Sequence, residues 1–258
     1  RKGNPNQVPM GFLLPESNWE VPRHLLNLSG ERMVAVDIET KDDGLANDIG
    51  PGWVYNMGHI AGIGITTSEE SCYYPIRHPD TSNWDVGPIR GLLLDLFRSD
   101  TRVVMHRAIY DLGWLTTEWE LPIPRNLEDS MIMEFTLHEY EKTFNLDDSC
   151  RRNGIKGKDE HLLKAAADAF GCDPKKDMWR MPAKYVGPYG EQDGTATLEL
   201  AQLLLPQIEA QGCMEAYRLE IDLIPMIIAM RRKGISIDGD YCEELKHQLL
   251  VDRDNILN

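Results

Sequence analysis

The sequence has few cysteines, no long apolar run and little positive charge. Its five cysteines are widely scattered and odd in number: Cys72, Cys150, Cys172, Cys213 and Cys242. No two cysteines have the close spacing of a zinc-binding pair, so we expect free thiols in a reducing compartment. No apolar run approaches the length that spans a bilayer, and the first residues do not have the pattern expected of a signal peptide. These absences argue against a disulfide-stapled scaffold and against a membrane protein.

The shortage of positive charge limits how the chain can meet nucleic acid. It has 27 Lys and Arg against 42 Asp and Glu in 258 residues, a net charge of −15. Proteins that hold duplex DNA by surface potential need a concentrated basic footprint, which this composition does not provide. An acidic chain can still act on nucleic acid if its carboxylates hold metal ions, or if a basic neighbouring domain delivers the substrate.

Strand patterns come first along the chain and helical patterns dominate later. We expect an extended arm over residues 1–30, and then strands over 33–37, 60–66, 71–76 and 103–105. Helices are expected over 88–97, 111–118, 189–210, 217–233 and 241–257, and a mostly helical pattern covers 127–171. We expect a loop over 174–188 and a short strand over 235–238. This order is typical of a mixed α/β sheet covered by helices.

Three short segments carry the candidate chemistry. Asp37 and Glu39 lie two apart at the end of an apolar strand, so both side chains leave the same face. Asp111 follows an apolar stretch where a strand turns into a helix, and Tyr189 and Asp193 lie at i and i+4 of a helix. Two like charges so close favour a bound cation or a retained proton, and ligation by oxygen alone suits Mg²⁺ or Mn²⁺.

Each of these segments has a plainer interpretation when it is taken singly. An isolated Asp-x-Glu is more often a solvated strand end, and a single Asp near a helix start is more often a cap. A Tyr and an Asp four residues apart are more often a surface pair. The functional hypothesis depends on all three occurring together.

Together the segments resemble the DnaQ-like exonucleases with Tyr in the third motif, the DEDDy subclass. The order Asp-x-Glu, aromatic-Asp, Tyr-x-x-x-Asp is present in Asp37–Glu39, Tyr110–Asp111 and Tyr189–Asp193. The resemblance implies an RNase H-like fold, a mixed five-stranded sheet flanked by helices. It also implies two divalent cations, Mg²⁺ or Mn²⁺. Their ligands would be Asp37, Glu39, Asp111 and Asp193, with Asp37 bridging both ions and Tyr189 positioning the attacking water.

The C-terminal region indicates which DnaQ-like exonucleases the chain resembles. Residues 219–226 followed by 230–238 look like the junction where the proofreading domain of family A DNA polymerases passes into the polymerase thumb. The resemblance covers residues 31–240 and leaves out an insert over 155–182, and the enzyme looks phage-like. It implies an arm over 1–30, an exonuclease domain over 31–210 and the start of a thumb over 211–258. A covalently linked polymerase domain would be its partner, in the cytoplasm of a bacterial or phage-infected cell.

The same resemblance suggests contacts with the nucleic acid. Leu45 lies where the family places an apolar wedge against terminal bases, although a packed or loop leucine is as plausible. Tyr110 could stack on a base or sugar, and Thr40, which directly follows Glu39, is a further candidate contact. His106 could contact the same end of the strand, although a packed core histidine is as plausible. Arg107 stands where family members usually carry Asn. It could grip a phosphate or crowd the substrate.

These residues predict a 3′→5′ proofreading exonuclease that hydrolyses phosphodiester bonds at single-stranded or frayed DNA 3′ ends. Two other hypotheses remain. One is an RNase D-like exonuclease acting on RNA, against which the polymerase-like tail argues. The other is a nucleic-acid-binding module whose nuclease site has been silenced, which the unusual Arg107 keeps open.

Overall fold

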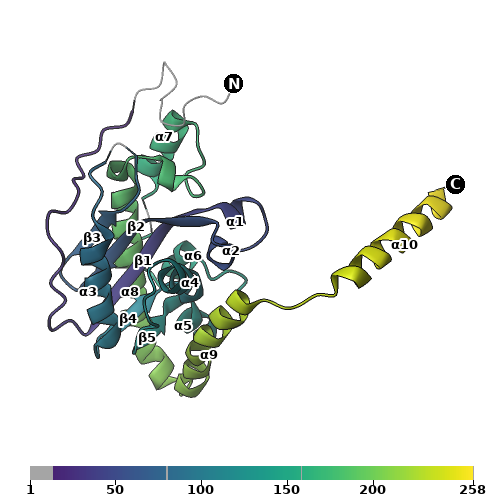
Figure 1. Ribbon diagram of the computed structural model, residues 1–258. Coiled ribbons are helices and arrows are strands. Elements are labelled where there is room, and N and C mark those ends of the chain that lie inside the picture. Colours follow the sequence, from purple (N-terminus) through teal and green to yellow (C-terminus); the bar gives the residue numbers. More distant parts are fainter. Residues whose placement is uncertain (1–13, 80, 158, 258) are drawn as a thin grey trace.

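The centre of the protein is a mixed five-stranded sheet (Figure 1). The computed structural model describes residues 14–79, 81–157 and 159–257. The strands are β1 (Met33–Asp42), β2 (Gly58–Thr66), β3 (Ser71–Pro75), β4 (Arg102–Met105) and β5 (Leu127–Asp129), in the order β3-β2-β1-β4-β5. β1 and β3 run antiparallel to β2, whereas β4 runs parallel to both β1 and β5. The predicted mixed five-stranded α/β fold is confirmed.

Helices flank this sheet and extend beyond it. In chain order they are α1 (Asp43–Ala46), α2 (Gly52–Tyr55), α3 (Val86–Arg98), α4 (Ala108–Glu118), α5 (Ser130–Leu137), α6 (Leu146–Arg152), α7 (His161–Phe170), the 3₁₀ turn η1 (Met178–Arg180), α8 (Ala183–Ala210), α9 (Met214–Lys233) and α10 (Gly239–Leu257). The long α8 packs on β1, β2 and β3, and α9 packs on α4, α5 and β5. Within the described ranges, none of these helices is both long and apolar enough to cross a membrane.

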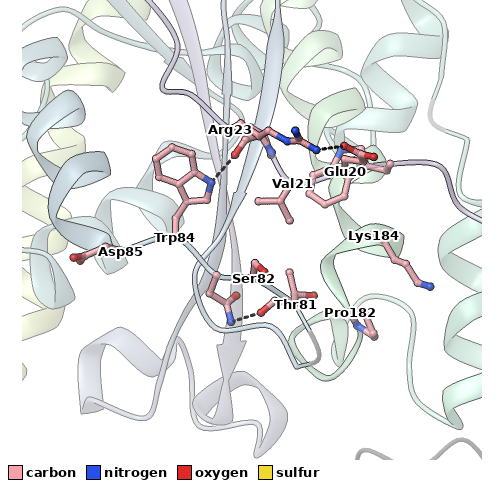
Figure 2. A pocket seen from close by; sticks show the side chains of 12 residues that line it. Glu20, Val21, Arg23, Thr81, Ser82, Trp84, Asp85, Pro182 and Lys184 are labelled. Carbon is pink, nitrogen blue, oxygen red and sulfur yellow. Dashed lines mark hydrogen bonds and ion pairs between the residues drawn. The ribbon is translucent and has the colours of Figure 1, made fainter.

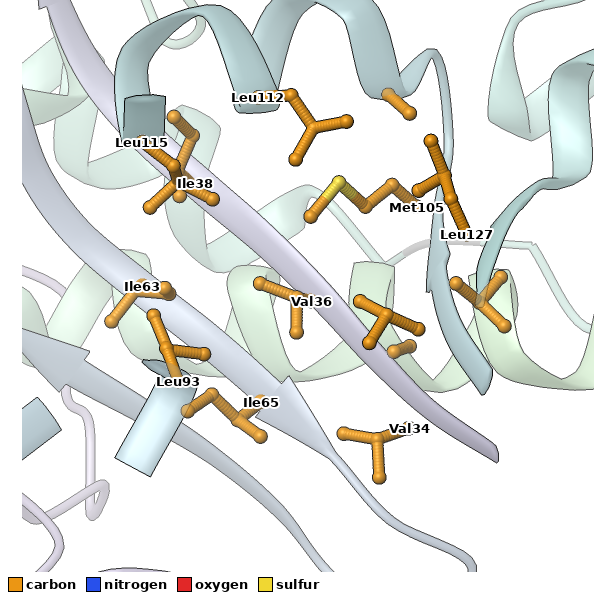
Figure 3. Packing of buried hydrophobic residues seen from close by; sticks show 14 of the residues in the cluster. Val34, Val36, Ile38, Ile63, Ile65, Leu93, Met105, Leu112, Leu115 and Leu127 are labelled. Atoms are coloured by element: carbon orange, nitrogen blue, oxygen red, sulfur yellow. The ribbon is translucent and has the colours of Figure 1, made fainter. Parts of the chain in front are cut away.

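Alternation along β1 separates a core face from a functional face. Val34, Val36 and Ile38 point into the apolar layer beneath α3 and α4, where Figure 3 shows them with Leu93 and Leu112. Each fully buried side chain of this kind stabilises the fold by about 1.5–3 kcal/mol. The residues between them leave the opposite face of the sheet, the one that α8 covers. The acidic residues of the first motif are therefore held by a central strand whose other face is anchored in the core.

Three predicted elements were wrong in type or extent. Residues 127–129 form β5 rather than the start of a helix, because they pair with β4. Residues 235–238 form no strand: Ile235 and Ile237 are 90% and 74% exposed and have no partner strand among the described residues. The expected loop over 174–188 instead contains η1 and the first turns of α8, which begins at Ala183.

A proline inside α8 explains the last of these errors. Pro188 has no backbone N–H, so the carbonyl of Lys184, four residues earlier, loses its helical partner. The Ser17 hydroxyl donates to that carbonyl at 2.6 Å. A residue from the N-terminal segment thus replaces the missing bond, and the helix continues through a proline that would ordinarily mark its boundary.

The N-terminal segment over 14–30 has no helix or strand and lies along the body of the protein. The Trp19 indole donates to Glu191 Oε1 at 2.9 Å, and the Trp84 indole donates to the carbonyl of Pro22 at 2.9 Å. Figure 2 shows the cavity that this segment forms with the 81–85 loop and the start of α8. The segment is therefore held by directed contacts, whereas residues 1–13 of the expected arm lie outside the described residues.

Burial of His78 should make stability depend on pH. Its ring is hydrogen-bonded to Tyr73 and Met181, and burial lowers its pKa to about 4. The unfolded chain binds this proton near pH 6.5, so stability is present above that pH and is lost as pH falls toward 4. Between pH 7 and 5, the free energy of unfolding should fall by about 2 kcal/mol more in the wild type than in His78→Gln.

Urea unfolding at the two pH values measures this difference. His247→Gln, on the exposed α10, is the matched control and should keep the wild-type slope. Equal slopes in the wild type and His78→Gln would show that the buried ring is not the source.

Candidate active site

Carboxylates from two distant segments meet on the α8 face of the sheet. Asp37 and Glu39 leave the same face of β1, and α8 presents Asp193 to them. Ligand oxygens of the three residues lie within 4.8 Å of one another. Glu39 and Asp193 are only 8% and 7% exposed. Carboxylates of the first and third motifs, more than 150 residues apart in sequence, therefore lie together in the fold.

Asp111 approaches the same strand from α4. Its Oδ1 accepts a hydrogen bond from the Ile38 N–H at 3.1 Å, which places the carboxyl between Asp37 and Glu39 along β1. Burial, followed by the negative charge of Asp37, raises the pKa of Asp111 well above its ordinary value. A buried acid beside another acid holds its proton unless a positive charge takes the proton's place.

Tyr189 lies one helical turn before Asp193 on α8, and its side chain is 6% exposed. Burial and then the nearby charges of Asp193, Glu39 and Asp37 raise the pKa of the Tyr189 phenol. The i, i+4 spacing on α8 places the phenol beside Asp193, and the raised pKa keeps its proton in place. A protonated phenol in this position can donate a hydrogen bond, which suits a group that orients a water molecule.

The chemistry of the cluster fits divalent cations. The donor atoms are carboxylate oxygens, the ligands that Mg²⁺ and Mn²⁺ prefer, and no sulfur or imidazole joins the group in the described part of the chain. Two or more buried like charges are unfavourable without a compensating cation. Asp37, Glu39 and Asp193 could therefore hold one ion, with Asp111 adjacent for a second.

Asp129 fixes the turn that delivers Asp111. One carboxylate oxygen accepts from the Arg107 N–H at 3.1 Å, and the other accepts from the Ala108 N–H at 2.7 Å. The first oxygen also accepts from the Met131 N–H at 2.8 Å, at the start of α5. A buried carboxylate thus ties the beginnings of α4 and α5 together below the site.

Arg107 occupies a backbone conformation that suits Asn. It begins α4 with φ 69° and ψ 51°, in the left-handed region where Asn is the best tolerated residue after Gly. The resemblance places Asn at this position, so the structure gives a backbone reason for that preference. The Arg107 side chain is exposed beside the site.

We expect Arg107→Asn to stabilise the protein. The substitution should relieve left-handed strain by about 1 kcal/mol and raise Tm by roughly 2–4 °C. Arg98→Asn, at the exposed end of α3, is the matched control and should bring no gain. Calorimetry of the three proteins measures the difference, and an unchanged or lower Tm for Arg107→Asn would contradict this explanation.

The expected substrate contacts are distributed around this site. Tyr110 Oη lies 2.7 Å from Thr40 Oγ1 and donates to Asp42 Oδ2 at 2.8 Å, so its phenol is already held. Asp42 also accepts from the Leu45 and Gly52 N–H groups, each at 2.8 Å. The short α1 carries Leu45, whose side chain is 47% exposed. Asp42 was not among the residues expected here, because its only signal in the sequence is its place three residues before Leu45.

His106 is engaged on both ring nitrogens. Nδ1 lies 2.8 Å from Ser130 Oγ, and Nε2 lies 3.0 Å from the carbonyl oxygen of Phe144. These bonds tie the start of α4 to α5 and to the following loop. His106 therefore holds neighbouring segments together through both of its ring nitrogens.

Comparisons with known proteins find that the chain is similar to part of several DNA polymerases. No protein-family model matches it. The DNA-directed DNA polymerase of Pseudomonas phage M6 is 33% identical over 254 residues, which are 95% of this chain and 37% of that protein. DNA polymerase I of Synechocystis sp. is 26% identical over 210 residues, which are 75% of this chain and 20% of that protein. The chain thus spans about a fifth to a third of these relatives.

Solved structures support the fold independently. NrnC of Brucella melitensis, in a structure with bound Mg²⁺, superimposes with a TM-score of 0.54 at 15% identity over 81% of this chain and 90% of that chain. The catalytic core of RRP6 from Trypanosoma brucei superimposes with a TM-score of 0.55 at 19% identity over 76% and 46% of the two chains. The resemblance inferred from the motifs is confirmed in kinship and fold. The chain is a homologue of part of phage and bacterial DNA polymerases, with the RNase H-like fold of DnaQ-like nucleases.

Proposed function

We propose that this chain is a 3′→5′ exonuclease that removes nucleotides from single-stranded or frayed DNA ends. The convergence of Asp37, Glu39 and Asp193 within 4.8 Å carries the proposal. Asp111 beside Ile38 completes a set of four carboxylates, and Tyr189 stands next to them. This constellation suits hydrolysis of a phosphodiester.

Each residue has a distinct task in the proposed reaction. Asp37, Glu39 and Asp193 would hold one cation and Asp111 would help to hold a second, with Asp37 shared. Two divalent cations, when bound, acidify water and neutralise charge on the phosphate and the leaving 3′ oxygen. Tyr189 would donate a hydrogen bond that orients the attacking water toward phosphorus. Asp129 would keep Asp111 in place by fixing the turn before it.

Kinship with polymerases supports proofreading as the purpose of this reaction. We propose that residues 31–210 form the exonuclease domain and that 211–258 begin the polymerase thumb. α10 lies apart from the sheet in Figure 1, and its described residues are exposed, which suits a segment that other structure covers. Melting terminal base pairs costs free energy, and a mismatched end costs less. An unpaired 3′ end would therefore be removed in preference to a paired one.

Digestion of labelled oligonucleotides tests the activity. We expect a 5′-labelled DNA strand to shorten stepwise from its 3′ end with Mg²⁺ or Mn²⁺. EDTA should stop the reaction, and excess Mg²⁺ should restore it. An RNA strand of the same sequence should be degraded more slowly. Faster RNA degradation would favour the RNase D-like hypothesis. Tight Mn²⁺ binding without cleavage of either strand would favour the silenced module.

A further inference from the structure

A cationic and aromatic patch lies next to the carboxylate cluster and belongs to none of the three motifs. Lys41 is two residues beyond Glu39 on β1, so strand alternation places it on the same face. Its Nζ lies 5.0 Å from the centroid of the Trp179 ring. The His59 ring meets Trp179 edge-on at 6.5 Å. We call these three side chains the insert patch, because Trp179 comes from the 155–182 insert.

A buried chain of contacts fixes the insert beside the site. η1, which carries Trp179, packs on β1. Just after η1, the Met181 carbonyl oxygen lies 2.8 Å from His78 Nδ1, and His78 Nε2 lies 2.8 Å from Tyr73 Oη. Tyr73 in turn covers Gly62, where an added Cβ would lie 2.0 Å from the Tyr73 hydroxyl oxygen. Gly62 pairs with Glu39, so the insert is positioned directly from the catalytic strand.

The positive charge of the insert patch suits it to contact a phosphate. The carboxylate cluster repels the phosphates of an incoming strand, and Lys41 is a cation on the same face of the same strand. Burial and then the charge of Arg77 lower the pKa of His59, so the positive charge of the patch belongs to Lys41. Lys41 Nζ is paired with Asp43 at 2.9 Å, and the Asp43 side chain is 42% exposed. The Lys41 side chain is 27% exposed, so this ion pair is partly open to solvent and Asp43 can be exchanged for a phosphate.

We propose that the insert patch binds the single-stranded nucleic acid that leads into the carboxylate site. Trp179 would stack on a base, and Lys41 would contact a backbone phosphate. Aromatic stacking combined with a cation is the general means of holding single strands without reading their sequence. The Trp179 side chain is only partly buried, so its contact with the Lys41 cation is weaker than a desolvated one, and Lys41 can leave Trp179 when a base arrives. This inference rests on the proposed nuclease function for its purpose.

Strand binding without hydrolysis tests the patch directly. Anisotropy of a fluorescent oligothymidylate in EDTA should show about 10-fold weaker binding for Trp179→Ala. Trp179→Phe keeps a stacking ring and should bind within about 3-fold of the wild type. Lys41→Gln should reduce the salt slope of binding by about 0.7, the loss of one phosphate contact. Tyr241→Ala and Lys246→Gln on α10 are matched controls and should bind like the wild type.

Hydrolysis of two substrates separates a binding role from damage to the site. The oligothymidylate reaches the patch, whereas a 5′-nitrophenyl ester of a single deoxynucleotide has no strand to occupy it. With Mn²⁺ present, Trp179→Ala should raise KM for the oligothymidylate and leave kcat/KM for the ester unchanged. Wild-type binding by both Trp179→Ala and Lys41→Gln would overturn the proposal, and so would equal losses on the two substrates. If the wild type hydrolyses neither substrate, the proposed nuclease function fails. The anisotropy measurements on the variants then decide by themselves whether the insert patch binds single strands.

Discussion

Asp37→Ala should lower the rate of DNA hydrolysis roughly 10³-fold or more while the protein remains folded. Asp37 belongs to the cluster with Glu39 and Asp193, in which ligand oxygens lie within 4.8 Å. Its charge also contributes to the raised pKa values of Asp111 and Tyr189. Removing it would deprive both proposed cation positions of a shared ligand. The loss should appear in the rate constant for hydrolysis of bound DNA, measured in a single-turnover assay at saturating Mg²⁺.

The stability of the same variant distinguishes a ligand from a structural residue. Asp37 is only half-buried, and its removal relieves repulsion among neighbouring carboxylates. In EDTA, the Tm of Asp37→Ala should therefore equal or exceed that of the wild type. Asp95→Ala, an exposed Asp on α3, is the control for generic effects and should keep full activity. Wild-type rates in Asp37→Ala would refute its assignment as a ligand.

Tyr189→Phe should slow hydrolysis by about 10-fold to 100-fold, less than the loss of a carboxylate. The phenol lies at the cluster with its proton retained, so it is suited to orienting water and not to removing a proton from it. The ring packs in a buried cluster with Tyr185 and Val186, and Phe preserves that packing. kcat should fall while KM stays near the wild-type value.

A pH–rate profile checks the role of the Tyr189 hydroxyl. If the phenol only orients water, the wild type and Tyr189→Phe should give profiles of the same shape between pH 6 and 9. If Tyr189→Phe lost more activity than Asp37→Ala, or lost one limb of the pH–rate profile, the hydroxyl would instead act as an acid or a base.

Much of this site could be predicted because the relevant patterns are local. Alternation in β1 places Asp37 and Glu39 together, and an i, i+4 spacing places Tyr189 beside Asp193. The resemblance supplied what periodicity cannot, namely that β1 and α8 meet. That convergence was the central expectation for the site, and the geometry brings the three carboxylates of these elements together.

The errors arose where distant residues override local pattern. Residues 127–129 are too few to show strand alternation, and only pairing with β4 makes them β5. The helix at Ala183 continues through Pro188 because Ser17 satisfies the carbonyl of Lys184. No local signal in the sequence reports that bond. The same limit hid Asp42 and the insert patch, since their partners lie far along the chain.

A diffraction measurement on crystals soaked in Mn²⁺ tests the central claim most directly. At the manganese absorption edge, an anomalous map should show two peaks. Oxygens of Asp37, Glu39, Asp111 and Asp193 should enclose them, and both peaks should vanish in Asp37→Ala. Manganese bound elsewhere, or peaks of wild-type height in that variant, would contradict the assignment of these carboxylates as the metal site.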